Sequence, residues 1–203
     1  YSISINYCIK RLNTGGEPYI REAFELYGAG LEQGVLLKDG YLSHIAFKNM
    51  VSLGIHLKRF ETVRDLLDRG SILLHPKYQP AYLPYNEAQY SFAIQEYDRA
   101  IDCLHQVVYD DLFMEIGARL LLAKIYTAQS HDQLLESHLH SFTQFIRRKA
   151  SLSAGHKARF LATIRFTQKV TQAYTKAQKQ GLRETIEATA ALPEKRWLLE
   201  QLD

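Results

Sequence analysis

The stretch Tyr85-Asn-Glu-Ala-Gln-Tyr-Ser-Phe-Ala-Ile-Gln-Glu-Tyr-Asp-Arg-Ala-Ile-Asp-Cys-Leu-His-Gln-Val107 carries the pattern from which the fold can be inferred. It holds an aromatic, a small and an aliphatic residue in the spacing Tyr97-x-x-Ala100-x-x-x-Leu104. The same spacing, opened by an aromatic or an acidic residue, recurs at Phe60-x-x-Val63-x-x-x-Leu67 and at Asp132-x-x-Leu135-x-x-x-Leu139, in steps of 37 and 35 residues. A repeat of this length indicates stacked helical hairpins.

Apolar residues on both sides of this stretch recur three or four positions apart, which is the helical period. Alternating, strand-like runs are scarce, so we expect an all-α protein. Predicted helices cover residues 3–12, 18–34, 43–58, 60–74, 80–94, 97–108, 112–129, 131–149, 153–179 and 182–190, and Pro193 opens a last turn or two. Residues 34–40 are predicted as a loop, and Ser43 and Ser130 as N-caps.

The helices follow one another with short connections and without a shift in composition, so we expect a single array of antiparallel helical hairpins over residues 1–203. We place a weak repeat at residues 1–34, repeats at about residues 43–76, 80–110 and 112–149, and atypical capping helices at residues 153–203. The chain begins without an initiator Met, so we expect a part of a longer protein or a processed form. An uncapped N-terminal end would then allow self-association.

The composition is that of an ordinary soluble domain. Of the 203 residues, 46% are hydrophobic and 23% are charged, with a net charge of +3 and a pI near 8.8. This mild charge does not favour a nucleic-acid partner. No apolar run is long enough to cross a bilayer and no secretory signal opens the chain, so we expect a cytoplasmic protein without a membrane partner.

Two cysteines, Cys8 and Cys103, have apolar neighbours and belong to no CxxC or CxxH pair. This arrangement carries no zinc signature. We interpret the two residues as small buried side chains in a reducing compartment, with a single long-range disulfide as the alternative.

The opening stretch resembles a tetratricopeptide repeat, a helical hairpin in which small residues let two helices approach closely. The matching residues are Asn86, Ala88, Tyr97, Ala100, Leu104 and Val107. Residues 118–142 match with Leu122, Ala123, Tyr126, Leu135, Leu139 and Phe142, and residues 47–70 match with Met50, Gly54, Phe60, Val63 and Leu67. Glu87 stands where the family usually has Leu, and Ser91 stands where an aromatic residue is common.

The order of helices also resembles the C-terminal part of larger bacterial tetratricopeptide-repeat proteins of unassigned function, including the closing Trp197-Leu198-Leu199-Glu200. The resemblance implies a right-handed superhelix whose first helices line a concave groove for a protein or peptide. Phasing the repeats places ten residues on that groove: Lys48, Ser52, His56, Tyr85, Gln89, Phe92, Lys124, Thr127, Arg165 and Lys169. Exposed rings beside polar groups suit a peptide ligand, and packing between repeats is the alternative for Tyr85 and Phe92.

Candidate catalytic and metal-binding residues form no recognised arrangement. His131, His138 and His140 lack the spacing of three or four that would place zinc ligands on one helix face. Asp110 and Asp111 precede a predicted helix, where carboxylates favour the N-terminus. No GxSxG, P-loop or GxGxxG motif occurs, so we expect no catalytic residue, no metal and no cofactor.

A basic stretch follows the third repeat, with two phenylalanines interleaved. Its members are Arg147, Arg148, Lys149, Lys157, Arg159, Arg165 and Lys169. We interpret it as a solvated helix face, with binding of an acidic peptide or of nucleic acid as alternatives.

Taken together, the sequence patterns predict a non-enzymatic scaffold that binds a protein segment. The alternative is the sensor or dimerisation part of a larger regulatory protein whose effector domain is absent from this chain.

Overall fold

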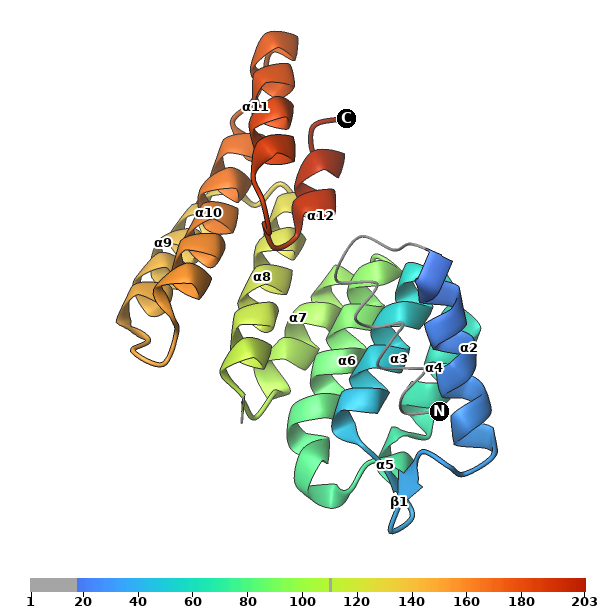
Figure 1. Cartoon of the computed structure of the whole chain (residues 1–203). Coiled ribbons are helices and arrows are strands. Elements are labelled where there is room, and N and C mark those ends of the chain that lie inside the picture. Colours follow the sequence, from blue (N-terminus) through green and yellow to red (C-terminus); the bar gives the residue numbers. More distant parts are fainter. Residues whose placement is uncertain (1–17, 110) are drawn as a thin grey trace. The chain divides into compact units, whose positions relative to one another are not determined.

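Helices make up most of the structure, a computed structural model that describes residues 18–109 and 111–203 (Figure 1). These residues form eleven α-helices, one 3-10 helix and a hairpin of two short strands. In chain order the elements are α2 (Pro18–Glu32), β1 (Leu37–Lys38), β2 (Tyr41–Leu42), α3 (His44–His56), α4 (Phe60–Asp68), α5 (Gly70–Leu73), η1 (Pro76–Tyr78), α6 (Gln79–Ala93), α7 (Tyr97–Gln106), α8 (Leu112–Ala128), α9 (Asp132–Arg148), α10 (Ala154–Thr171), α11 (Lys176–Ala188) and α12 (Lys195–Glu200). The predicted all-α class is confirmed, and the helix predicted at residues 3–12 lies outside the described residues.

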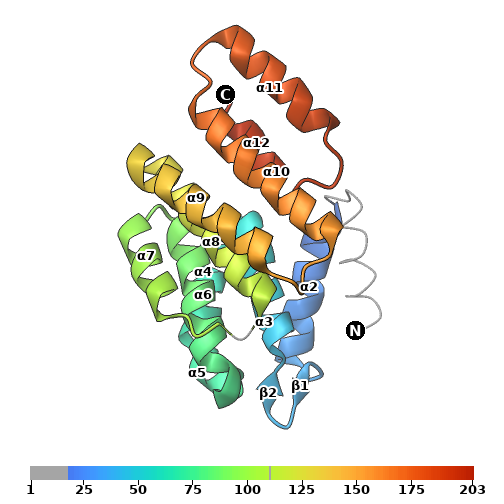
Figure 2. The same cartoon turned by 90° about the vertical axis from the view of Figure 1, so that its left-hand side faces the viewer.

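The chain divides into two compact units, the first ending at Ala118 and the second beginning at Arg119. In the first unit, α3 packs against α2, α4 and α6, and α6 packs against α4 and α7 (Figure 2). In the second unit, α10 packs against α9, α11 and α12. The single array over residues 1–203 stays a prediction.

One kind of turn joins α3 to α4, α6 to α7 and α8 to α9. The residue that follows each helix C-cap has a positive φ, which is 56° at Lys58, 65° at Gln95 and 54° at Ser130. The next N–H group donates to a carbonyl near the end of the preceding helix, from Arg59 to Gly54, from Glu96 to Ser91 and from His131 to Tyr126, at 2.8, 2.8 and 2.9 Å. Such left-handed turns satisfy carbonyl groups that a helix end leaves free. The turns follow one another at steps of 37 and 35 residues, as the repeated spacing does.

The helix after each of these turns begins without a side-chain cap. The N-cap residues Arg59, Glu96 and His131 make no capping hydrogen bond with their side chains. The prediction of Ser130 as an N-cap is therefore wrong, because the backbone places Ser130 in the left-handed position of the turn. Here the backbone itself closes the turn.

Small residues lie where the helices of the first unit approach most closely. Ala88 and Ala100 are fully buried. A Cβ atom on Gly54 of α3 would collide with the Val63 side chain of α4 and would lie 3.0 Å from Cε2 of Phe24. The small positions of the repeated pattern are therefore required by packing.

The segment between α2 and α3 differs from the prediction. Residues 34–40, predicted as a loop, contribute β1 to a short antiparallel hairpin in which Leu37 pairs with Leu42. Its turn has positive φ at both Asp39 and Gly40, a combination that suits a two-residue hairpin. The predicted N-cap Ser43 is confirmed, because its hydroxyl accepts a hydrogen bond from the Ala46 N–H at 3.1 Å.

The helix predicted at residues 60–74 is interrupted. It ends at Asp68, and α5 begins at Gly70. A side chain on Gly70 would collide with Leu83 of α6 and would lie 3.2 Å from Cζ of Phe47, so the glycine permits a close approach at this break. Periodicity did not reveal the interruption, because apolar residues continue through it.

Pro84 lies inside α6 and removes one helical donor. A proline has no N–H group, so the carbonyl four residues earlier, that of Pro80, lacks its usual partner. The Val108 N–H donates to this carbonyl at 3.1 Å. The segment after α7 is thereby attached to α6.

The C-terminal helices also correct the prediction. The long helix predicted at residues 153–179 ends at Thr171, and α11 begins at Lys176, with a capping box between Thr175 and Gln178. Gln180 and Gly181, predicted as a helix end, lie inside α11. A cluster of buried apolar side chains holds α10 to α12 together: Phe166, Val170, Ile186, Leu192, Leu198 and Leu202.

Candidate functional site

The structure brings together two of the predicted groove residues of the first unit. The Ser52 hydroxyl of α3 donates to Oε1 of Gln89 of α6 at 3.3 Å. These residues are 37 positions apart, so they occupy equivalent places in consecutive repeats. On α3, Lys48 is half-buried and His56 is exposed. A row of polar side chains therefore runs from α3 to α6.

The two aromatic groove residues of α6 are not fully exposed rings. Tyr85, predicted to offer an exposed ring, is instead buried, with 6% of its surface accessible. A side chain on Gly117 would collide with the Tyr85 hydroxyl, so this ring fills space against the start of α8. Phe92 is half-buried, and its ring centroid lies 5.8 Å from that of Tyr97. For Tyr85 the structure therefore agrees with the alternative interpretation, in which the ring packs between helices and is not offered to a ligand.

The predicted groove residues of α8 have partners within the second unit. The Lys124 ammonium pairs with the Glu194 carboxylate and lies 5.6 Å from the centre of the Trp197 ring. The Thr127 hydroxyl donates to the Ala123 carbonyl at 2.9 Å. Lys124 therefore connects α8 to the segment that leads into α12.

Arg165 and Lys169 of α10, the last two predicted groove residues, are both exposed. The Arg165 guanidinium lies 5.8 Å from the centre of the Phe166 ring. Elsewhere in the basic stretch, the Lys157 ammonium donates to the Arg147 carbonyl at 3.1 Å. The phenylalanines Phe160 and Phe166 are buried, so they present no rings for stacking on a ligand.

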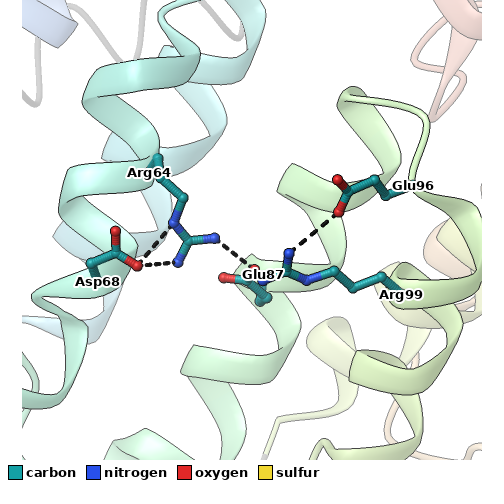
Figure 3. Close-up of polar contacts among 5 residues, drawn as sticks. All are labelled: Arg64, Asp68, Glu87, Glu96 and Arg99. Carbon is teal, nitrogen blue, oxygen red and sulfur yellow. Dashed lines mark hydrogen bonds and ion pairs between the residues drawn. The ribbon is translucent and has the colours of Figure 1, made fainter.

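Sequence reasoning missed a charged cluster that links three helices of the first unit (Figure 3). Oε1 of Glu87 in α6 accepts from Arg64 of α4 at 2.7 Å and from Arg99 of α7 at 2.6 Å. Arg64 also donates to Asp68 at 2.7 Å and 2.9 Å, and Arg99 donates to Glu96 at 3.3 Å. The departure of Glu87 from the family pattern was the available signal, since leucine could not bridge two arginines.

Glu87 is the most buried group of this cluster. The Glu87 side chain is 16% exposed, against 31% for Arg64 and 53% for Arg99. The hydrogen bond to Glu87 is the main cause that raises the pKa of Arg64 above its ordinary value. Charge-assisted bonds of this kind fix the position of the shared carboxylate.

An open pocket of about 530 Å³ lies beside the charged cluster, among α4 to α7. Its apolar walls include Leu67, Leu83 and Pro84, and its acidic residues are Asp68 and Glu87. A volume of this size is typical of sites that hold a small ligand or a few side chains.

Cys103 of α7 also lines this pocket and carries a free thiol. Burial raises the pKa of the Cys103 thiol, and the negative charge of Glu87 adds to this effect. The thiol is therefore uncharged near neutral pH and is a weak nucleophile there.

The histidines predicted not to bind zinc have other surroundings. Nε2 of His138 lies 2.8 Å from the Arg119 carbonyl, and burial lowers the pKa of His138. His131 and His140 are exposed. In the part of the chain that the structure describes, no group of three or more His, Cys, Asp or Glu side chains could hold a metal ion.

None of the helices in residues 18–109 and 111–203 combines the length and the apolar character needed to cross a bilayer.

The chain was compared with known proteins in three ways. Models of protein families, curated proteins and solved structures all gave no match. The recurring turns and the polar row are therefore the features that bear on its function.

Proposed function

We propose that this chain is a tetratricopeptide-like array of helical hairpins that binds a segment of another protein and catalyses no reaction. The observation that carries the proposal is the left-handed turn after α3, α6 and α8, which recurs at the steps of the repeated spacing. A turn that recurs with the same hydrogen bonds gives successive helix pairs the same local geometry, as stacked repeats require.

The polar row on α3 and α6 is the surface that we assign to the partner. Lys48, Ser52, His56 and Gln89 offer a cation, a hydroxyl, an imidazole and an amide along two neighbouring helices. Such groups can bond to the backbone and side chains of a segment laid across the helices. The half-buried ring of Phe92 adds an apolar contact at the end of α6.

A photo-cross-linking amino acid at position 52 tests this assignment. It replaces Ser52 of α3, and the control carries the same amino acid at Glu61, an exposed residue of α4 that is not part of the polar row. We expect a protein partner to be captured from position 52 and not from position 61. Equal capture from both positions, or capture from position 61 alone, would contradict the proposal. Cross-links between two copies of the chain would instead support the alternative role in dimerisation.

A further inference from the structure

The pocket among α4 to α7 has apolar side chains in its walls, and the charged side chains that line it are both acidic. Leu67, Leu83 and Pro84 form the apolar part, and Asp68 and Glu87 are the charged residues that line it. Neither Arg64 nor Arg99 lines the pocket, although both bind Glu87.

The second carboxylate oxygen of Glu87, Oε2, is available to a further hydrogen-bond donor. Both arginines bond to Oε1, and Oε2 accepts no hydrogen bond from the residues that the structure describes. Asp68 lies on the same pocket, with 62% of its side chain exposed. Two carboxylates thus face a space whose walls also include the apolar side chains of Leu67, Leu83 and Pro84.

The charge of the surrounding segment has the same sign. Residues 60–106 contain four Lys or Arg and seven Asp or Glu, which gives a net charge of −3 within a chain of net charge +3. The five groups of Figure 3 hold two arginines and three carboxylates. A segment with net negative charge attracts cations, and salt weakens the attraction.

We propose that this pocket binds a lysine or arginine side chain of a partner protein, with an apolar neighbour of that side chain against Leu67, Leu83 and Pro84. The cationic end would approach Asp68 and Oε2 of Glu87, and its methylene groups would cover the apolar wall. An anionic ligand is disfavoured, because the charged side chains that line the pocket are both carboxylates. The pocket is separate from the polar row on α3 and α6, so this proposal does not rest on that assignment.

Cys103 makes the pocket accessible to measurement. In a Cys8→Ser background it is the one cysteine among these 203 residues, so maleimide alkylation of this polypeptide reports on the pocket alone. The probes are N-acetyl-Leu-Arg-Leu-amide and its citrulline counterpart, which keeps the shape of arginine without the charge. We expect the arginine peptide to slow alkylation in a saturable way. The citrulline peptide should need about a three- to tenfold higher concentration for the same protection.

A matched pair of variants identifies the carboxylate. Asp68 and Asp65 both lie on α4, are 62% and 68% exposed, and each pairs with an arginine four residues away. Only Asp68 of the two lines the pocket. Asp68→Asn is expected to weaken protection by the arginine peptide about three- to tenfold, and Asp65→Asn is expected to leave it unchanged.

Four results would overturn the proposal. They are equal protection by the two peptides, no protection at about 10 mM peptide, equal loss in Asp65→Asn and Asp68→Asn, and alkylation that slows with protein concentration alone. The last result would show that a second copy of the chain covers the pocket. None of these results concerns the polar row, so the proposed function can fail or stand separately.

Discussion

The turns after α3, α6 and α8 and the turn between α10 and α11 connect helices in different ways. In the repeated turns the backbone closes around one residue of positive φ, and no side chain caps the helix that follows. Before α11 the φ of Gln172 is −106°, and Thr175 and Gln178 cap the helix with their side chains. A turn held by its backbone accepts many side chains, whereas a capping box needs particular ones. The repeated turns therefore depend on backbone conformation, and the turn before α11 depends on capping side chains.

The strongest test of this comparison is the close helix contact at Gly54. Gly54→Ala would force a Cβ atom against Val63 and Phe24, so we expect the free energy of unfolding to fall by about 2 kcal/mol. Gly28→Ala in α2 is the matched control, because no atom lies within 4 Å of its added Cβ. There the better helix propensity should raise the free energy of unfolding by about 0.8 kcal/mol. Urea unfolding measures both, and equal stability of the two variants would argue against a close contact at Gly54.

A second test removes the side-chain cap of the C-terminal region. Thr175→Ala deletes the hydroxyl that accepts from the Gln178 N–H at 3.1 Å, so we expect a loss of about 1 kcal/mol in the free energy of unfolding. Ser130→Ala is the control in a repeated turn, where the serine makes no capping bond, and its effect should stay within about 0.5 kcal/mol. A larger loss at Ser130 than at Thr175 would reverse the comparison.

A third test removes the backbone strain at the left-handed residue of a repeated turn. Gln95 has a φ of 65°, which glycine adopts more easily, so Gln95→Gly should raise the free energy of unfolding by about 0.5 kcal/mol. The same substitution at Gln172, where φ is −106°, should lower it by a similar amount, about 0.5 kcal/mol. Thermal unfolding of the two variants checks the signs, and equal signs would show that backbone conformation does not separate the two regions.

The smallest test concerns Ser91, the second departure from the family pattern. Ser91 is fully buried, and its hydroxyl has no hydrogen-bond partner within the described residues. Ser91→Ala removes a polar atom that gains nothing from burial, so we expect the free energy of unfolding to rise by about 0.5 kcal/mol. Ser52→Ala, at an exposed residue of α3, is the control, with no change expected beyond about 0.5 kcal/mol. A clear loss of stability at Ser91 would mean that the hydroxyl has a partner.

Helix positions could be predicted from the sequence wherever apolar periodicity and a serine cap coincide. Ser43 is such a case, because its own side chain caps α3. Ser130 was misassigned since its turn is closed by main-chain atoms, which any residue carries. The hairpin of β1 and β2 was missed because two-residue strands are too short to show alternation. The end of α10 was missed because apolar spacing continues past Thr171.

The candidate sites could be predicted from the sequence less well than the fold. Repeat phasing found the equivalent positions Ser52 and Gln89, but it could not tell that Tyr85 packs against Gly117. The pocket depends on side chains from four successive helices, and periodicity gives no distance between helices. Glu87 was visible only as a departure, because its arginine partners lie 23 residues before it and 12 residues after it in the chain.

Pro84 makes one amide proton a local reporter of the α6–α7 hairpin. Val108 lies outside any helix, where amide protons usually exchange quickly with solvent, yet its N–H is bonded to the Pro80 carbonyl. Its exchange rate therefore records how often the segment after α7 detaches from α6. A single resonance can thus be used to watch this hairpin open under native conditions, before any global unfolding occurs.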